Sequence, residues 1–156
     1  MTELDRTDRR LIHALQGDAT LTNAELGERL NLSASQAGRR RQKLEEGAII
    51  TGARALVDAP KVGLTIESFV QVVMAGHSRR NAKDFETAMQ RRPEIVAVWT
   101  LTGEADYLLR VYTPDLKALN HLVQEVLLDN PAVARVQSQI VMDRVKPDAP
   151  LPLDGD

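Results

Sequence analysis

The first third of the chain repeats apolar residues at the three- and four-residue spacing of amphipathic helices. Three such segments follow one another, and each is bounded by residues that cap or stop helices. We predict helices over about residues 6–16, from Thr22 to near Asn31, and over residues 34–46. Only Asn31 and Leu32 separate the last two segments. Helices joined by so short a turn cross steeply, which predicts a helix-turn-helix.

Short polar residues mark the starts of these helices, because their side-chain oxygens accept hydrogen bonds from backbone N–H groups that have no partner inside the helix. The expected N-caps are Asp5 or Thr7, Thr22 and Ser33. Glu25 follows Thr22 at the spacing of a capping box. Gly47 stands where a left-handed residue commonly closes a helix.

The pattern changes after this helical unit. Residues 49–57 are apolar and β-branched, which predicts a linker strand, and Pro60 and Gly63 then interrupt the chain. Beyond them we expect strands over residues 65–75, 95–102, 106–112 and 133–142, and helices over residues 81–91 and 114–130. This βαββαβ order is that of a ferredoxin-like domain, an antiparallel sheet with both helices on one face.

The predicted fold class is therefore α+β, with a winged-type helix-turn-helix of three helices joined by a strand linker to a ferredoxin-like βαββαβ domain. The expected limits are residues 1–48 for the helix-turn-helix, 49–63 for the linker strand and hinge, 64–146 for the ferredoxin-like domain and 147–156 for a flexible tail. Phe69, Trp99 and Leu101 make the second face of the sheet too apolar for solvent. We therefore expect a second copy of the chain to cover this face in a homodimer.

Composition narrows the range of functions. The chain has 156 residues and no cysteine, which excludes disulfides, thiolate nucleophiles and thiolate zinc sites. It has neither a signal-like N-terminus nor an apolar run of membrane-spanning length, so we expect a cytoplasmic protein without a membrane partner. The net charge is −2, so a nucleic-acid partner requires positive charge that is gathered locally.

Positive charge gathers in the third predicted helix. Residues 33–44 contain Arg39, Arg40, Arg41 and Lys43 and no acidic residue. A recognition helix places its N-terminal half against base edges in the major groove, and arginine can hold guanine with two hydrogen bonds. The expected DNA-binding residues are Ser33, Ser35, Gln36, Arg39, Arg40 and Lys43. Arg41 can instead lay its methylene groups on the hydrophobic floor and extend its charge outward.

Seven motifs follow one another along the chain: LDRTDRRLI from Leu4, LQGDA from Leu15, TNAELG from Thr22, LSAS from Leu32, LEEGAII from Leu44, TGEADYLL from Thr102, and Val141-Met142. In this order they resemble the Lrp/AsnC, or feast/famine, family over about residues 4–146. The resemblance implies a dimeric, nucleoid-associated transcription factor, often assembled into tetramers or octamers. Its C-terminal (RAM) domain would bind an amino acid or a related metabolite between subunits. Arg41 departs from the family pattern, which usually has an aliphatic residue there, and so does Gly38 in the middle of the recognition helix.

The motif from Thr102 predicts a hairpin tip. A glycine there exposes backbone N–H groups to a carboxylate, and Asp106 or Glu104 can accept hydrogen bonds from an ammonium group. Together with the family resemblance, this predicts effector binding by Thr102, Gly103, Glu104, Asp106, Tyr107 and Ser138. The alternative is a purely structural loop, in which Gly103 closes the turn and Asp106 caps it.

Other functions have less support in the sequence. His13, His77 and His121 are isolated, so we expect neither a metal site nor a general base. A small ferredoxin-like enzyme would need a nucleophile or an acid-base pair, and none is visible. We expect no enzyme activity and no cofactor apart from the effector. An architectural, nucleoid-like DNA-binding protein without an effector is the main alternative.

Overall fold

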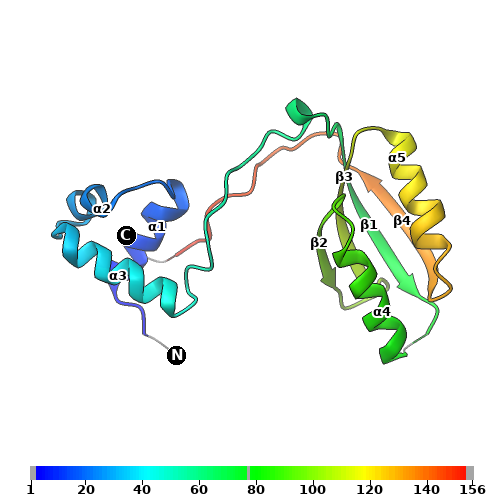
Figure 1. Cartoon of the computed structure of the whole chain (residues 1–156), viewed down its shortest axis with the longest axis horizontal. Coiled ribbons are helices and arrows are strands. Elements are labelled where there is room, and N and C mark those ends of the chain that lie inside the picture. The colour runs from blue at the N-terminus through cyan, green and yellow to red at the C-terminus, as the bar shows by residue number, and fades with distance from the viewer. Residues whose placement is uncertain (1–2, 77, 154–156) are drawn as a thin grey trace. The chain divides into compact units, whose positions relative to one another are not determined.

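The computed structural model describes residues 3–76 and 78–153 and divides into two compact units. The head unit comprises Met1–Leu56 and Val145–Asp156, and the sheet unit comprises Val57–Arg144. The chain therefore leaves the head unit once and returns to it near its C-terminal end (Figure 1). Within the described part of the chain, no helix combines the length and apolar character that crossing a membrane requires.

Three helices form the head unit and confirm the predicted helix-turn-helix. They are α1 (Arg6–Gly17), α2 (Asn23–Leu30) and α3 (Ala34–Glu46). Each begins with a capping box, in which the N-cap side chain accepts a hydrogen bond from a backbone N–H of the first turn. The three N-caps are Asp5, Thr22 and Ser33. The core of the unit gathers Leu11, Leu21, Leu26, Leu30, Ala37 and Leu44.

The residues that follow α2 and α3 differ in backbone conformation. Asn31 closes α2 in the left-handed conformation, with φ of 55°. The sequence predicts the same for Gly47 after α3, but Gly47 has φ of −77° and Ala48 has the positive φ, 52°. The backbone N–H of Ile49 donates to the Leu44 carbonyl at 2.9 Å. This later turn brings Ile49 back against the helical core.

The predicted linker strand, and with it a wing, is absent from the described chain. Residues 51–57 belong to no sheet, and Leu56 and Val57 are 92% and 65% exposed. A strand needs a neighbouring backbone to satisfy its N–H and C=O groups. No such strand lies beside the linker within residues 3–76 and 78–153. The linker instead continues into a short helical turn, η1 (Pro60–Val62).

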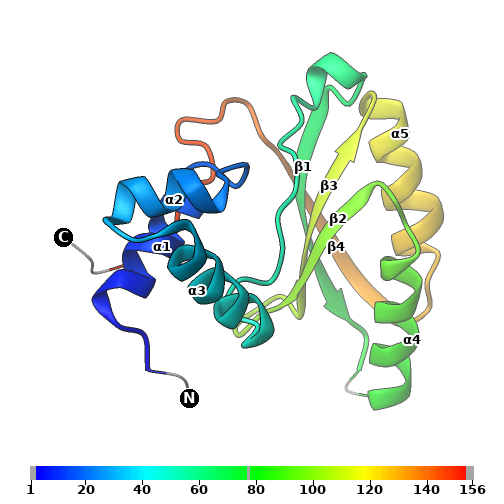
Figure 2. The ribbon, with the colours of Figure 1, turned by 60° about the vertical axis from the view of Figure 1, so that its left-hand side comes forward.

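The sheet unit has the predicted ferredoxin-like architecture. Its strands are β1 (Ile66–Met74), β2 (Ile95–Thr100), β3 (Tyr107–Thr113) and β4 (Val133–Ile140), and its helices are α4 (Arg79–Gln90) and α5 (Leu116–His121), the latter continued by the π-helical η2 (Leu122–Leu128). The strand order is β2-β3-β1-β4, all neighbours being antiparallel. Both helices cover one face of the sheet (Figures 1 and 2). The α5 helix begins after Pro114 rather than at it, because Asp115 caps it through a 2.7 Å hydrogen bond from the Ala118 N–H.

The other face of the sheet, which we term the open face, is more polar at its centre than the sequence suggests. Val70 and Leu109 belong to the core beneath the helices, whereas Phe69 and Arg110 are paired across β1 and β3 on the open face. Arg110 contacts the Phe69 ring at 6.0 Å and also forms a 2.8 Å ion pair with Glu67. Two of the three expected apolar residues are exposed, Trp99 by 44% and Leu101 by 40%.

The sequence predicts a flexible tail, but within the described residues the tail is bound to the head unit through Leu151. Leu151 exchanges two hydrogen bonds with the Gln16 side chain of α1, at 2.6 and 3.3 Å. Leu151 and Leu153 also line a cavity of the head unit. The low apolar content of the tail misleads here, because the Leu151 backbone binds Gln16 although the Leu151 side chain is 70% exposed.

Candidate DNA-binding helix and effector loop

The N-terminus of α3 is organised by Ser33 and Gln36. Ser33 Oγ accepts a hydrogen bond from the Gln36 N–H at 3.2 Å, and Gln36 Oε1 accepts one from the Ser33 N–H at 2.9 Å. Both side chains are exposed, as is Ser35 between them. Because the cap uses the Gln36 oxygen, the amide nitrogen is the group that Gln36 can offer to DNA.

Arg39 and Lys43 lie on the outer side of α3, one helical turn apart. Both are exposed, and neither forms a hydrogen bond or ion pair with another described residue. The two ends of the buried stripe of this helix, Ala37 and Leu44, point the other way. Arg39 and Lys43 are therefore the cations that α3 presents to solvent.

Arg40, by contrast, is turned toward α1. Its Nη1 lies 2.7 Å from Asp5 Oδ2 and 2.6 Å from Asp8 Oδ1. The Asp8 N–H bond and the Arg40 guanidinium lower the pKa of Asp5 below its usual value, and the two carboxylates raise the pKa of Arg40. The predicted direct contact with DNA is not what this geometry offers, because both carboxylates of the α1 cap hold the guanidinium.

Arg41 lies on the opposite side of the buried stripe. It donates from Nη1 to the Leu21 carbonyl at 3.0 Å and from Nε to Glu45 at 2.9 Å. The alternative role predicted for Arg41 differs from the observed one, because the guanidinium does not extend outward but binds within the head unit. The bond to Leu21 links α3 to the loop that precedes α2.

Two glycines allow α2 and α3 to cross closely. A Cβ atom on Gly27 would lie 2.7 Å from the Leu32 backbone oxygen. A Cβ atom on Gly38 would lie 2.8 Å from Nδ2 of Asn23 at the start of α2. Gly38, a departure from the family pattern, thus makes room for a side chain of the neighbouring helix.

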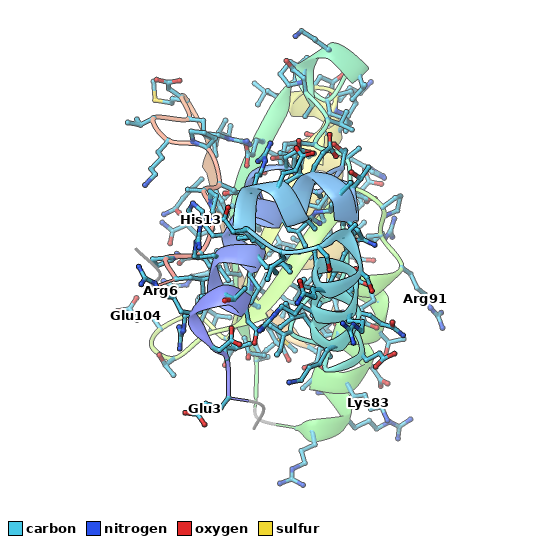
Figure 3. The ribbon with its side chains drawn as sticks, turned by 90° about the vertical axis from the view of Figure 1, so that its left-hand side faces the viewer. Glu3, Arg6, His13, Lys83, Arg91 and Glu104 are labelled. Atoms are coloured by element: carbon cyan, nitrogen blue, oxygen red, sulfur yellow. The ribbon has the colours of Figure 1, made fainter. Side chains whose placement is uncertain are left out.

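The loop between β2 and β3 gathers four of the predicted effector-binding residues, Thr102, Gly103, Glu104 and Asp106. Gly103 has φ of 112°, a conformation that strongly favours glycine. Thr102 and Gly103 are exposed, and the Glu104 side chain is 96% exposed (Figure 3). The loop tip thus offers backbone N–H groups and a carboxylate to solvent.

Asp106 ties this loop to β1. Its Oδ2 accepts a hydrogen bond from the Met74 N–H at 2.7 Å, and its own N–H donates to the Val72 carbonyl at 2.9 Å. One carboxylate oxygen is therefore engaged with the fold, which agrees with the structural alternative. The other oxygen, Oδ1, can still accept a hydrogen bond from a ligand.

The last two predicted effector residues lie away from the loop tip. Tyr107 is buried, its ring is tilted by 43° against the Phe85 ring at 4.9 Å, and its hydroxyl donates to Glu86 at 3.0 Å. Burial and then the Glu86 carboxylate raise the pKa of Tyr107 to about 12. Ser138 is exposed on β4, which is separated from β3 by β1. A single chain therefore does not bring all six residues to one place.

Sequence reasoning missed some partners of these residues. Arg135 on β4 lies 3.9 Å from Glu104, and Asp5 and Asp8 were not recognised as partners of Arg40. The described residues contain no group of three or more histidine or acidic side chains that could hold a metal ion. His121 pairs with Glu125 at 3.0 Å, and His77 lies outside the described residues.

Comparison with known proteins adds an independent line of evidence. The AsnC-type helix-turn-helix domain matches residues 4–45, and the Lrp/AsnC ligand binding domain matches residues 67–151. The DNA-binding transcriptional activator DecR of Escherichia coli is 33% identical, over 97% of this chain and 99% of its own. The leucine-responsive regulatory protein of Rhizobium meliloti is 34% identical, over 92% of each chain.

Solved structures are similar over the same extent. A transcriptional regulator of Neisseria meningitidis in complex with L-methionine has a TM-score of 0.93 and 35% identity, covering 97% of this chain and 98% of that one. An AsnC family transcriptional regulator of Agrobacterium tumefaciens has a TM-score of 0.89 and 35% identity at the same coverage. Both units, and not one of them alone, are shared with these proteins.

Proposed function

The chain belongs to the Lrp/AsnC family of DNA-binding transcriptional regulators, and from this premise we propose how its residues divide the work. In this proposal α3 enters the major groove of double-stranded DNA, and the loop between β2 and β3 takes part in binding a small effector. Because the partner is chromosomal DNA, we place the protein on the nucleoid in the cytoplasm. A regulator of this kind needs no catalytic group and no cofactor.

The observation that carries the DNA proposal is the outward position of Arg39 and Lys43 on a capped helix. Arg39 can contact guanine or phosphate, while Ser35 and Gln36 lie one turn earlier, at the end of the helix that meets base edges. Ser33 remains the cap and lies near the backbone of the DNA. Arg40 has a different role, which is to hold the helix in place.

A salt titration tests this assignment. The affinity for a duplex from upstream of the protein's own gene is measured between about 50 and 200 mM salt. Each phosphate that the protein no longer neutralises should reduce the slope of log affinity against log salt by about 0.9. Arg39→Gln with Lys43→Gln should flatten this slope, whereas Arg91→Gln, at an exposed position of the sheet unit, should not. Equal slopes for all three proteins would contradict the role of α3.

For the effector we propose an amino acid or a related metabolite. The exposed N–H groups around Gly103 suit its carboxylate, and the Oδ1 atom of Asp106 or the Glu104 carboxylate suits its ammonium group. The relative from Neisseria meningitidis binds L-methionine, which supports this chemical class. Calorimetric titration with the twenty amino acids is the test. Silence at millimolar concentrations, with DNA binding intact, would favour an architectural DNA-binding protein.

We further propose that the protein works as a homodimer or as a tetramer or octamer built from it. Two features support this proposal. A second copy could cover the exposed side chains of Trp99 and Leu101. It could also supply a partner strand to residues 51–57, which belong to no sheet. Two recognition helices spaced by one DNA turn would then read a pseudo-palindromic site. Sedimentation velocity of the protein and of Trp99→Ser measures the assembly, and a monomer at micromolar concentration would contradict the proposal.

A further inference from the structure

A groove on the head unit is bordered by the C-terminal part of the same chain. Leu151 and Leu153 line a cavity of about 530 Å³ together with apolar residues of the helical core, among them Ile12 and Leu15 of α1. Arg41 and Glu45 of α3 line the same cavity. The tail and the Arg41 side of α3 therefore border the same cavity.

Gln16 binds the backbone of this tail segment. Its Oε1 accepts a hydrogen bond from the Leu151 N–H at 2.6 Å, and its Nε2 donates to the Leu151 carbonyl at 3.3 Å. One amide side chain thus satisfies both backbone groups of one residue, as a neighbouring strand would. This contact fixes the position of Leu151 along the groove.

The sequence of the segment suits docking. Pro150 and Pro152 alternate with Leu151 and Leu153. Proline fixes its own φ and restricts the residue before it to extended conformations, so the segment loses little conformational entropy when it docks. Leu153 is partly buried at the groove, whereas the Leu151 side chain is 70% exposed, so Leu151 is held through its backbone bonds to Gln16.

A second anchor lies just before this segment, on the sheet unit. Arg144 donates to Glu67 Oε2 at 2.6 Å and to the Tyr112 hydroxyl at 2.9 Å. Only seven peptide units separate Arg144 from Leu151, so the two anchors can move apart by at most about 25 Å, at ~3.6 Å per residue. The linker from Ile50 to Ile66, with sixteen units, would allow about 55 Å.

We infer that residues 145–153 form a strap: the segment Pro150–Leu153 docks in the groove of its own head unit and shortens the reach between head and sheet units. Such a strap halves the distance that the linker alone permits. Its existence is independent of any ligand. Its consequence for DNA rests on the proposed function, because a shorter reach raises the effective concentration of a second head at a second half-site.

Distances between two labels test the strap without DNA. Since the chain has no cysteine, Glu28→Cys on α2 and Lys83→Cys on α4 give two exposed, specific labelling positions. Pulsed electron paramagnetic resonance is recorded on labelled chains diluted in an excess of unlabelled protein, which restricts the signal to distances within one chain. Gln16→Ala and the pair Leu151→Ser with Leu153→Ser should both widen the distance distribution.

Val145→Ser is the matched control, because Val145 belongs to the strap but is 95% exposed. It should leave the distribution unchanged. Unchanged distributions for the groove variants would overturn the proposal. A second sample carries the two labels on different chains. A widening confined to that sample would also overturn the proposal, since the occupant of the groove would then be the tail of a second copy.

The DNA consequence is measured separately on duplexes with one and with two half-sites. When the groove variants release the strap, the tether between head and sheet units lengthens from seven to sixteen peptide units. Binding to the two-site duplex should then weaken about threefold, because effective concentration falls roughly as the −3/2 power of tether length. Binding to the one-site duplex should not change. A protein that binds neither duplex would refute the proposed function and leave the distance result, and therefore the strap, standing.

Discussion

Arg40 of α3 and Asp8 of α1 lie 2.6 Å apart, although 32 positions separate them in the sequence. The same guanidinium nitrogen is 2.7 Å from Asp5. Asp5 and Asp8 are also the two members of the capping box of α1, and the Asp8 side chain is only 8% exposed. The start of the first helix is thereby tied to the middle of the recognition helix, and we assign Arg40 to positioning rather than to contact with DNA.

Arg40→Gln should therefore weaken DNA binding without changing its salt dependence. The substitution removes the cation that fixes the rotation of α3 but leaves every phosphate neutralised, so the slope of log affinity against log salt should equal that of the wild type. Arg39→Gln, one residue away, should reduce the slope by about 0.9 for the phosphate that Arg39 neutralises. Fluorescence anisotropy with a labelled duplex measures both.

Asp8→Asn provides the matched test of the same bridge. It should reproduce the weaker affinity of Arg40→Gln, and the double variant should bind little more weakly than either single one, because all three break one interaction. The free energy of unfolding of Arg40→Gln should fall by about 1–3 kcal/mol, since a nearly buried carboxylate is left without its partner. A reduced salt slope in Arg40→Gln would return this residue to the DNA interface.

The sequence already contained part of this information about α3. With 100° between successive residues, Arg40 and Arg41 flank the stripe of Ala37 and Leu44, whereas Arg39 points away from it. Which of the four cations of α3 face solvent was therefore predictable. The acidic partners were not, because the rotation and position of α1 depend on side-chain packing between helices.

The same distinction between local and distant interactions holds elsewhere. The starts of α1, α2 and α3 and the order of elements follow from capping residues and periodicity, which are local, and they were predicted correctly, whereas α4 and α5 begin two residues from their predicted starts. The linker strand failed because a strand needs a partner that residues 51–57 do not find among the described residues. The docked tail was missed because Gln16 and Leu151 are 135 positions apart. Tyr107 was placed in the effector site because it belongs to the family motif from Thr102, and its strand position gives no hint of Glu86 on α4.

Gly27→Ala should destabilise the head unit through the crossing of α2 and α3. The new Cβ would lie 2.7 Å from the Leu32 backbone oxygen, which belongs to the turn and cannot move like the end of a side chain. We expect the free energy of unfolding, measured by urea denaturation, to fall by about 1–3 kcal/mol. Gly17→Ala is the control, because its Cβ would meet nothing within 4 Å, and it should be neutral or slightly stabilising. Equal effects at both glycines would contradict the close crossing.

Asp106→Asn separates the two roles of the effector loop. An asparagine side-chain oxygen can still accept the hydrogen bond from the Met74 N–H, so the fold and its stability should be retained. The negative charge is removed, so binding of an amino acid should weaken at least tenfold if Asp106 receives the ammonium group. Calorimetry with the effector, alongside thermal unfolding, gives both values. Unchanged affinity would leave Asp106 with a purely structural role.

Tyr107 should make the stability of the sheet unit sensitive to alkaline pH. Burial and Glu86 raise the pKa of Tyr107 from 10 to about 12 in the folded protein. Below pH 10 the phenol is neutral in both states, and its contribution is complete. Between pH 10 and 12 the unfolded chain releases this proton and the folded chain retains it, so the contribution is lost as pH rises through this range. At 1.36 kcal/mol per pKa unit, the decrease approaches about 3 kcal/mol.

Comparison with Tyr107→Phe isolates this effect from the other groups that titrate in alkali. Both proteins are unfolded with urea at pH 9 and at pH 11.5. The wild type should lose more stability than Tyr107→Phe between these values, because phenylalanine has no proton to release. The lysines and Tyr112 are the same in both proteins, so their contributions cancel in the difference. An identical pH dependence in the two proteins would mean that Tyr107 is not held neutral beneath α4 by its burial and its bond to Glu86.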